Sequence, residues 1–192
     1  LKAYRIVPTS NSTGIVEVIP NTMSLDALKK TDGFVSLPHY FDKVYGTSPE
    51  RLARAKNNYV ASLAAYSLAC YIIGIKDRHN GNILIDRDGH IVHIDFGFLL
   101  GIAPGGSFSI ESAPFKLTEE MIDVFGGLDS PYFSHFVKAF TCVPQRLFVH
   151  VGFVMSMVAR GGQVRCGRKA FSCVPQTLFV HAAPSPLTLT TG

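Results

Sequence analysis

The first part of the chain alternates between apolar and polar residues, and a helical spacing follows it. Residues 4–20, YRIVPTSNSTGIVEVIP, alternate and are rich in β-branched side chains, so they predict two strands joined by a turn at SNSTG. Residues 21–31, NTMSLDALKKT, then predict a short helix with Ser24 as its N-cap. The segment HYFDKVYG, residues 39–46, predicts a further helical turn.

A long helix is predicted over residues 47–75. Pro49 suits the first helical position after a Ser48 cap, and the helix is expected to end near Gly74. The apolar stretch at residues 59–75 falls somewhat short of the ~20 residues that span a bilayer, so we expect a helix buried in a protein core. Seven residues recur at three- and four-residue steps and share one helical face, namely Leu52, Ala55, Tyr59, Leu63, Tyr66, Cys70 and Ile73.

The following segments predict a hairpin, a loop and two helices. Residues 82–97, NILIDRDGHIVHIDFG, divide at the turn sequence DRDG, which leaves NILI and HIVHI as the strands of a β-hairpin. The next residues, up to Pro114, are rich in Gly, Ser and Pro and predict a mobile loop. Thr118 and Gly126 then delimit a helix, and residues 130–140 predict another.

The character of the sequence changes after Phe140. AFTCVPQRLFVH at residues 139–150 recurs as AFSCVPQTLFVH at residues 170–181. Two copies are too few for a stacked solenoid. We therefore interpret residues 141–192 as an atypical duplicated tail, either a duplication or a wrongly translated segment, and expect it to be irregular.

Composition narrows the class of protein. A hydrophobic fraction of 47% supports a folded core, and a net charge of +4 without a long basic run argues against nucleic-acid binding. The chain begins at Leu1 within a predicted strand, so we expect a fragment. No pair of cysteines forms a CxxC motif, which favours a reducing compartment over a disulfide framework; the cysteines are Cys70, Cys142, Cys166 and Cys173.

The candidate chemistry lies in residues 75–97, IKDRHNGNILIDRDGHIVHIDFG. Phosphoryl transfer from ATP needs Mg²⁺ held against the phosphates, and Mg²⁺ prefers oxygen ligands from one or two protein groups. Asn82 offers an amide oxygen and Asp95 a carboxylate, and the hairpin between them folds the chain so that both can face one ion. Gly97 lets the backbone turn out of the strand.

Asp77 and His79 are candidates for the base that receives the proton of the acceptor hydroxyl. Histidine titrates nearest to neutrality, whereas Asp77 can orient the ring or act itself. Arg78 is expected to pair with a carboxylate and fix the loop.

A zinc site made by His79, His90 and His93 is the rival interpretation. It is disfavoured because these residues lie on a loop and a strand pair, without a helix that spaces ligands. Alone, His90 and His93 are read as strand residues, and the aspartates of the DRDG segment as turn formers.

The segments DRHNGNILID and HIDFGF resemble the phosphatidylinositol 3-/4-kinase family. Further segments, YRIVPTSNSTGIVEVIPNTMSL and FKLTEEMIDVFGGLDSPYF, are most similar to the type III phosphatidylinositol 4-kinases of the beta form, over residues 4–140. The resemblance implies an α+β fold, the mostly helical C-lobe of a protein-kinase-like lipid kinase with a catalytic β-hairpin. Residues 1–23 would then form the end of the N-lobe and the hinge, and residues 24–140 the C-lobe.

The resemblance also implies residue roles. Glu17, Val18 and Ile19 match the hinge that binds adenine, through the carbonyl of the first and the N–H of the last. Ile85 and Ile94 would form the floor of the adenine site. The catalytic loop is matched by Asp77, His79 and Asn82, and the metal-binding aspartate by Asp95.

The implied activity is ATP- and Mg²⁺-dependent phosphorylation of the inositol 4-hydroxyl of phosphatidylinositol. The implied location is cytoplasmic, peripheral on Golgi or other internal membranes. The loop over residues 98–114 would face the lipid headgroup, and it contains neither Lys nor Arg. Such a loop fits plain phosphatidylinositol better than a bisphosphorylated lipid, and its apolar FLL and FSI segments can touch a bilayer.

The sequence departs from the family at both ends. A glycine-rich loop, an ATP-binding lysine and its helix glutamate are expected before the hinge, and Lys2, Lys29 and Lys30 lie in the wrong contexts for that lysine. The tail also replaces the family's last helices. We therefore expect this fragment alone to be weak or inactive. The alternatives are a phosphatidylinositol 3-kinase, a related protein kinase and a non-catalytic truncated fragment.

Overall fold

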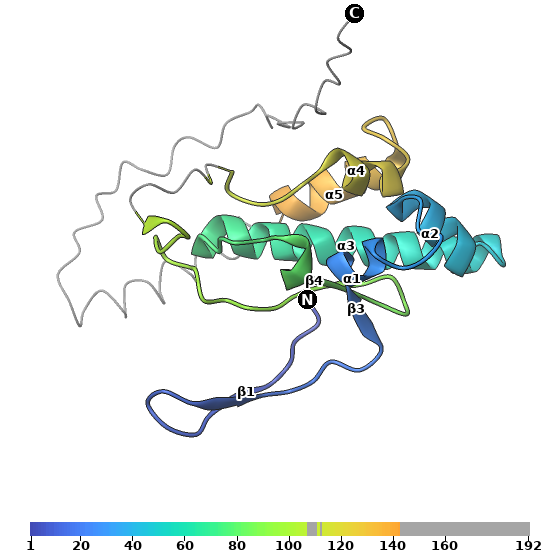
Figure 1. The fold of residues 1–192 in the computed structure, drawn as a ribbon. Coiled ribbons are helices and arrows are strands. Elements are labelled where there is room, and N and C mark those ends of the chain that lie inside the picture. Colours follow the sequence, from blue (N-terminus) through green and yellow to red (C-terminus); the bar gives the residue numbers. More distant parts are fainter. Residues whose placement is uncertain (107–110, 112, 143–192) are drawn as a thin grey trace, which may run out of the picture. The chain divides into compact units, whose positions relative to one another are not determined.

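The structure is a computed structural model that describes residues 1–106, 111 and 113–142. Its described elements are helices combined with two small antiparallel sheets, so the α+β class is confirmed (Figure 1). One compact unit covers Leu1–Phe140. The predictions for residues 143–192, and those for most of residues 107–112, lie outside the described residues.

The elements in chain order are β1 (Ile6–Pro8), β2 (Gly14–Val16), β3 (Thr22–Ser24), α1 (Leu25–Lys29), α2 (Leu37–Tyr45), α3 (Pro49–Ile73), the 3-10 turn η1 (Asn80–Asn82), β4 (Ile83–Asp86), β5 (Ile91–His93), α4 (Glu119–Phe125) and α5 (Pro131–Cys142).

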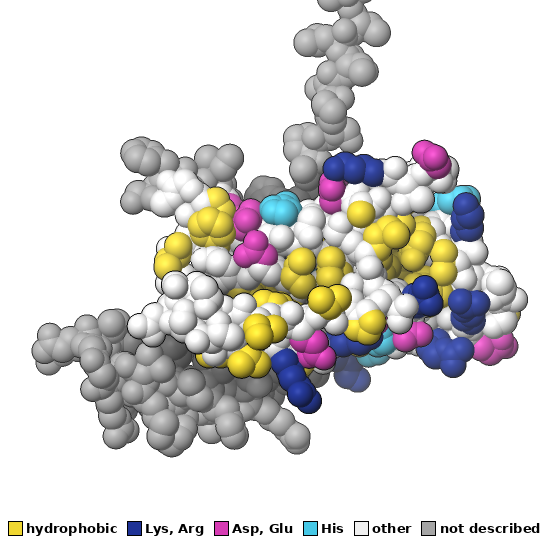
Figure 2. Space-filling view, turned by 60° about the horizontal axis from the view of Figure 1, so that its bottom comes forward, with side chains coloured by type: hydrophobic (Ala, Val, Ile, Leu, Met, Phe, Trp, Pro, Cys, Tyr) yellow, Lys and Arg dark blue, Asp and Glu magenta, His cyan; other side chains and the backbone are white. Residues whose placement is uncertain are grey.

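Both predicted strand pairs are present. β1 and β2 form a two-stranded antiparallel ribbon, and β3, β4 and β5 form a three-stranded sheet in that order. In the larger sheet Ile85 of β4 pairs with Met23 on one side and with Ile91 on the other. The ribbon is exposed, and the face seen in Figure 2 carries apolar side chains among scattered charged ones.

The long helix α3 begins and ends where the sequence predicts. The Ser48 hydroxyl accepts from the Arg51 N–H, and Gly74 ends the helix with a φ of 68°. Of the seven predicted face residues, the five central ones are buried, Leu52 is half-buried, and Ile73 is 39% exposed. No helix in the described part of the chain combines the length and apolarity needed to cross a membrane.

The shorter helices carry the predicted caps. The hydroxyls of Ser24 and Thr118 accept from the N–H groups of Ala27 and Met121, and Gly126 ends α4 in a left-handed conformation. The predicted turn at residues 39–46 is a longer helix, because Ser36 caps it and Pro38 lies in its first turn. Local signals therefore set most of the boundaries.

An aromatic core holds the helices together. The rings of Phe41, Tyr59, Phe125 and Phe136 are fully buried and come from α2, α3, α4 and α5. Phe41 packs edge-to-face on Tyr59, with 5.2 Å between ring centroids, and Tyr59 packs on Phe125 at 5.9 Å. Burial of rings of this size dominates the energetics of a small core.

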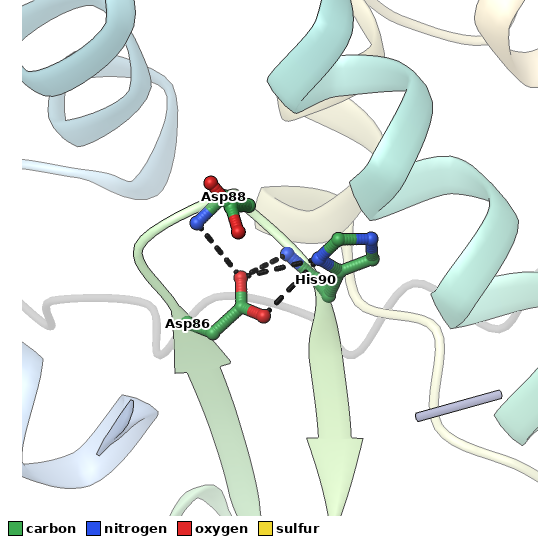
Figure 3. Close-up of side chains that lie close together, drawn as sticks. All are labelled: Asp86, Asp88 and His90. Atoms are coloured by element: carbon green, nitrogen blue, oxygen red, sulfur yellow. Dashed lines mark hydrogen bonds and ion pairs between the residues drawn. The ribbon is translucent and has the colours of Figure 1, made fainter. Parts of the chain in front are cut away.

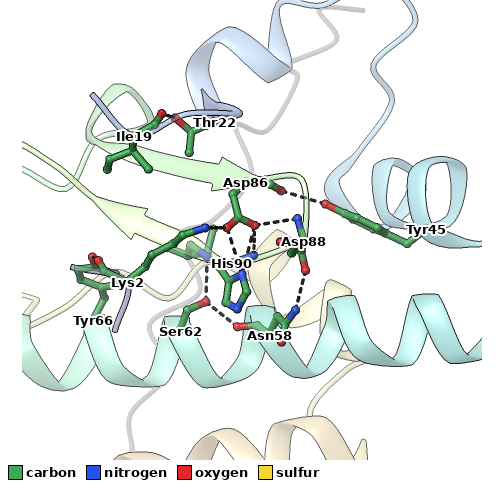
Figure 4. A network of polar contacts seen from close by, with 11 residues as sticks. Lys2, Ile19, Thr22, Tyr45, Asn58, Ser62, Tyr66, Asp86, Asp88 and His90 are labelled. Atoms are coloured by element: carbon green, nitrogen blue, oxygen red, sulfur yellow. Dashed lines mark hydrogen bonds and ion pairs between the residues drawn. The ribbon is translucent and has the colours of Figure 1, made fainter. Parts of the chain in front are cut away.

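The β4–β5 hairpin is attached to this helical body at its tip (Figure 4). The Tyr45 hydroxyl donates to the Asp86 carbonyl at 3.1 Å, and the Asn58 amide donates to the Asp88 carbonyl at 2.9 Å. Gly89 has a φ of 85° and lies so close to Ala55 that an added Cβ would be 2.8 Å from its carbonyl oxygen. The tip therefore packs directly on α3, and the open end of the hairpin holds a fixed position.

Candidate functional site

The loop between α3 and β4 contains three of the predicted catalytic residues, Asp77, His79 and Asn82, whereas Asp95 follows β5. Asp77 has a φ of 62°, a left-handed conformation that is unfavourable for a residue with a Cβ. Its N–H donates to the Glu111 carboxylate at 3.0 Å, and its carbonyl accepts from the Asn82 side-chain amide at 3.0 Å. Asn82 is buried, so this contact closes the loop from residue 77 to residue 82.

The hairpin brings the positions of Asn82 and Asp95 together. The Ile94 N–H donates to the Asn82 carbonyl at 3.0 Å, so Asp95 comes one residue after the partner of Asn82. Asp95 is exposed, has a φ of 58°, and accepts from the Gly97 N–H at 3.2 Å. An amide oxygen and a carboxylate at adjoining positions are the ligand types that Mg²⁺ prefers.

The prediction that Arg78 pairs with a carboxylate is wrong. Its side chain instead holds this region through backbone carbonyls. Its side chain is only 4% exposed. Nε and Nη1 donate to the carbonyls of Lys76 and Ile94, each at 2.8 Å, and Nη2 donates to the carbonyl of Asp95. Carbonyls withdrawn from water need donors, and the planar guanidinium can serve these three part-buried ones at once.

His79 and Asp77 lie close to each other at the surface. The Nε2 of His79 is 3.8 Å from an Asp77 carboxylate oxygen, and the side chains are 59% and 31% exposed. The Nδ1 of His79 accepts from the Gly81 N–H at 3.1 Å. This hydrogen bond assigns the proton of the neutral ring to Nε2, on the side of the carboxylate.

A cavity of about 630 Å³ lies between residues 16–19 and the open end of the hairpin. Pockets of a few hundred cubic ångströms with largely apolar walls are typical of small-ligand sites. The predicted hinge residues, Ile94 and Asp95 all line it. The full lining is Tyr4, Ile6, Val16, Glu17, Val18, Ile19, Thr22, Leu84, Ile94, Asp95 and Phe96.

Ile85 is not part of this lining, so the sequence prediction for that residue needs correction. It is 2% exposed and belongs to the hydrophobic core, whereas Leu84 lines the cavity. Neighbouring residues of a strand point to opposite faces of the sheet. Because of this alternation only one of the two residues can face the cavity, and the packing of Ile85 in the core leaves that place to Leu84.

Other residues near the cavity and the loop could not be predicted from the local sequence. Tyr4 and Phe96 stack across the cavity lining, with 6.5 Å between ring centroids. Lys76 donates to the carbonyls of Glu111 and Ala113, at 3.2 and 2.9 Å. Lys116 donates to the Asn80 side-chain oxygen at 2.8 Å. These contacts join segments more than thirty residues apart, and those of the two lysines link Glu111, Ala113 and Lys116 to the loop between α3 and β4.

His79, His90 and His93, the ligands of the disfavoured zinc interpretation, do not form a group with metal-ligand spacing in the described part of the chain. His93 is buried and stacks on Tyr66 at 4.5 Å, and burial, with smaller contributions from Arg78 and Lys116, lowers the pKa of His93 to about 3. In the described part of the chain, the group with metal-ligand spacing is instead Asp86, Asp88 and His90 (Figure 3).

This group is explained by the hairpin turn. Asp86 accepts at 2.9 Å from the N–H groups of both Asp88 and His90, and Lys2 donates to it at 2.6 Å. Burial acts to raise the pKa of Asp86, but the hydrogen bonds from Lys2, His90 and Asp88 hold it below its ordinary value. The carboxylate is thus committed to the turn, as the sequence predicted for this residue.

Comparison with known proteins agrees with these observations. The family model described as phosphatidylinositol 3- and 4-kinase matches residues 1–163. The chain belongs to this family of lipid kinases.

Within this family, the chain is similar to individual proteins named phosphatidylinositol 4-kinase. The chain is 56% identical over 138 residues to the phosphatidylinositol 4-kinase of Dictyostelium discoideum. It is 45% identical over 141 residues to phosphatidylinositol 4-kinase beta 2 of Arabidopsis thaliana. It is also 43% identical over 137 residues to phosphatidylinositol 4-kinase beta of Xenopus laevis. Each match covers 71% of this chain and only 12–17% of the relative.

Proposed function

We propose that the chain carries the catalytic loop, hinge and metal-binding segment of a phosphatidylinositol 4-kinase. The reaction is transfer of the γ-phosphoryl group of ATP to the inositol 4-hydroxyl of phosphatidylinositol. The observation that carries the proposal is the hydrogen bond between Ile94 and Asn82, which sets Asn82 close in the hairpin to Asp95, a residue of the cavity lining. The relatives' names support the choice of the 4-hydroxyl over the 3-hydroxyl.

In this proposal the cavity receives adenine. The backbone carbonyl of Glu17 and the N–H of Ile19 bind the base, next to Val18, and Leu84 and Ile94 form its apolar floor. Asn82 and Asp95 would hold magnesium, which neutralises charge on the ATP phosphates when it is bound. Residues 24–140 then act as the C-lobe of a kinase-like domain, and residues 1–23 as the hinge with the end of the N-lobe.

Asp77 is the better candidate for the base. In the neutral ring of His79 the Nδ1 is occupied by the Gly81 N–H, so Nε2 is a donor and cannot accept a proton. The Asp77 carboxylate accepts the proton of the inositol hydroxyl as the new O–P bond forms and ADP leaves. His79 donates its Nε2 hydrogen bond to that carboxylate or to the developing charge.

The substrate in this proposal is plain phosphatidylinositol presented by a membrane surface. The absence of Lys and Arg from residues 98–114 supports it, since a bisphosphorylated ring calls for cations. We extend the proposal to a cytoplasmic enzyme, peripheral on Golgi or other internal membranes. This extension rests on the family resemblance alone.

The test is a chimera in which residues 4–140 replace the matching segment of the Dictyostelium relative. It is assayed with labelled ATP, magnesium and vesicles of phosphatidylinositol or its bisphosphate, and the products are separated by chromatography. We expect the 4-phosphate of the plain lipid, and we expect Asp95→Asn to lower turnover at least a hundredfold, as is typical for loss of one charge-stabilising group. Asp32→Asn, the same change at an exposed site, should leave turnover unaltered.

Each alternative predicts a different product. A 3-phosphate would identify a 3-kinase, and phosphorylation of protein without lipid would identify a related protein kinase. A folded chimera without turnover would overturn the proposal in favour of a non-catalytic fragment. The 192-residue chain assayed alone is expected to be weak or inactive.

A further inference from the structure

Lys116 is a cation beside the catalytic loop to which the proposed reaction assigns no role so far. It lies between the loop at residues 98–114 and helix α4. Its Nζ donates to the side-chain oxygen of Asn80 at 2.8 Å. Asn80 is the first residue of η1 and is flanked in the sequence by His79 and, two positions on, by Asn82.

Among the residues that the structure describes, the charge of Lys116 has no counter-ion within ion-pair distance. Across the described residues, no carboxylate forms an ion pair with it. The nearby acids are engaged elsewhere, since Glu120 pairs with Lys29 and accepts from Leu37, and Glu111 accepts from the N–H of Asp77. Half-buried cations without counter-ions are costly, so such a site favours an anion.

The lowered pKa of Lys116 agrees with a site that favours an anion. Burial first, and then the charge of Lys29, lower the pKa of Lys116, and the opposing effects of Glu120 and Glu111 do not restore it. An ammonium group has three donors, and the hydrogen bond to Asn80 uses one of them. Lysine is a common phosphate ligand in proteins.

We propose that Lys116 binds the phosphodiester of the inositol lipid headgroup beside the catalytic loop. The inference rests on the proposed function. A phosphate could also come from the nucleotide, but Lys116 does not line the cavity assigned to adenine. It is instead the first cation after a loop that has none, and its single charge matches the single charge of a phosphodiester.

Binding at this point orients the substrate. The phosphodiester is attached to position 1 of the inositol ring, and position 4 lies opposite to it. A ring held at its phosphate turns its far side away from Lys116, so this contact selects the hydroxyl that is presented for reaction. Lys116 is thus a binding and specificity-determining residue, distinct from the residues assigned to magnesium and proton transfer.

The test uses the full 192-residue chain labelled with ¹³C-lysine, and it needs no catalytic turnover. The probes are glycerophosphoinositol, myo-inositol without phosphate, and ADP with magnesium. We expect glycerophosphoinositol to shift the side-chain resonance of Lys116 and to raise its measured pKa, while the other two probes leave it unchanged. No response to glycerophosphoinositol, or a larger one to ADP with magnesium, would overturn the proposal.

Three variants make the test specific. Lys116→Met should weaken glycerophosphoinositol binding by about tenfold or more, the usual effect of losing one charged hydrogen bond. Lys116→Arg should keep most of the affinity, and Lys30→Met, at an exposed lysine that pairs with Asp26, should keep all of it. Equal binding by Lys116→Met and Lys30→Met would refute the assignment. If the shift is seen but the chimera phosphorylates no lipid, the proposed function fails and the binding site stands.

Discussion

Arg78 shows how one side chain can hold a strained segment. Asp95 has a left-handed φ of 58°, and such conformations cost about 1–3 kcal/mol for residues other than glycine. The Arg78 guanidinium binds the carbonyls of Ile94 and Asp95 and so holds the backbone on both sides of that bend. Its planar fork makes this geometry available, whereas lysine has only a compact head.

We expect Arg78→Lys to destabilise the chain by roughly 2–4 kcal/mol, because the lysine head leaves at least one of these part-buried carbonyls without a donor. Urea unfolding followed by circular dichroism measures the change. Arg5→Lys, the same substitution at an exposed arginine, should alter the free energy of unfolding by less than about 0.5 kcal/mol. If the two variants are equally stable, the carbonyl contacts do not hold the segment.

Among single residues, predictability follows the range of the contact. Asp77, His79, Asn82 and Asp95 could be singled out as candidates because their types and order along the chain signal the chemistry, and their roles stay predictions. The hydrogen bond between Lys116 and Asn80 spans thirty-six positions and has no local signature. The partners of Arg78 were mispredicted for the same reason, since a sequence shows side chains but not which backbone carbonyls are left without donors.

At the scale of elements, the turn of the β4–β5 hairpin depends on the ionised form of Asp86. Its folded pKa lies below the ordinary value of 3.8, so its contribution to stability is present above that value and is lost as pH falls through the folded pKa. The carboxylate accepts from two turn N–H groups and from Lys2. Protonation removes the charge that strengthens these hydrogen bonds.

Asp86→Asn should therefore be less stable than the wild type by about 1–3 kcal/mol at neutral pH, with a smaller difference below about pH 4. Urea midpoints measured from pH 3 to pH 7 give this difference directly. Asp88→Asn, at an exposed position of the same turn, serves as the control and should follow the wild type. A stability gap that stays constant over the whole pH range would show that the charge of Asp86 is not involved.

Elements were predictable where their signals are local. Ser24, Ser48 and Thr118 cap helices in the structure as their sequence context indicates, and the DRDG turn separates the two hairpin strands. The finding that Leu84 and not Ile85 lines the cavity could not be predicted in this way, because it depends on which face of β4 meets the core. That face is decided by packing of the sheet against α3, which is a tertiary contact.

At the scale of the molecule, the unit Leu1–Phe140 contains its own core. α5 contributes Phe136, which is fully buried and packs on Phe125 with 5.7 Å between ring centroids. The sequence predicted each helix separately, yet the aromatic contacts between helices were not predictable, because they join residues that are distant along the chain. Stability of the site should accordingly depend on α5, which contributes no residue to it.

Two truncations test this dependence. A chain ending at Cys142 keeps the whole described core, so it should unfold with the same urea midpoint as the full chain. A chain ending at Gly127 loses α5 and the ring of Phe136, and since truncation of one buried phenylalanine to alanine already costs about 3–5 kcal/mol, it should be largely unfolded. Circular dichroism at 222 nm compares the three. A large loss of stability in the chain that ends at Cys142 would mean that residues beyond 142 support the core. A stable chain that ends at Gly127 would mean that α5 does not support it.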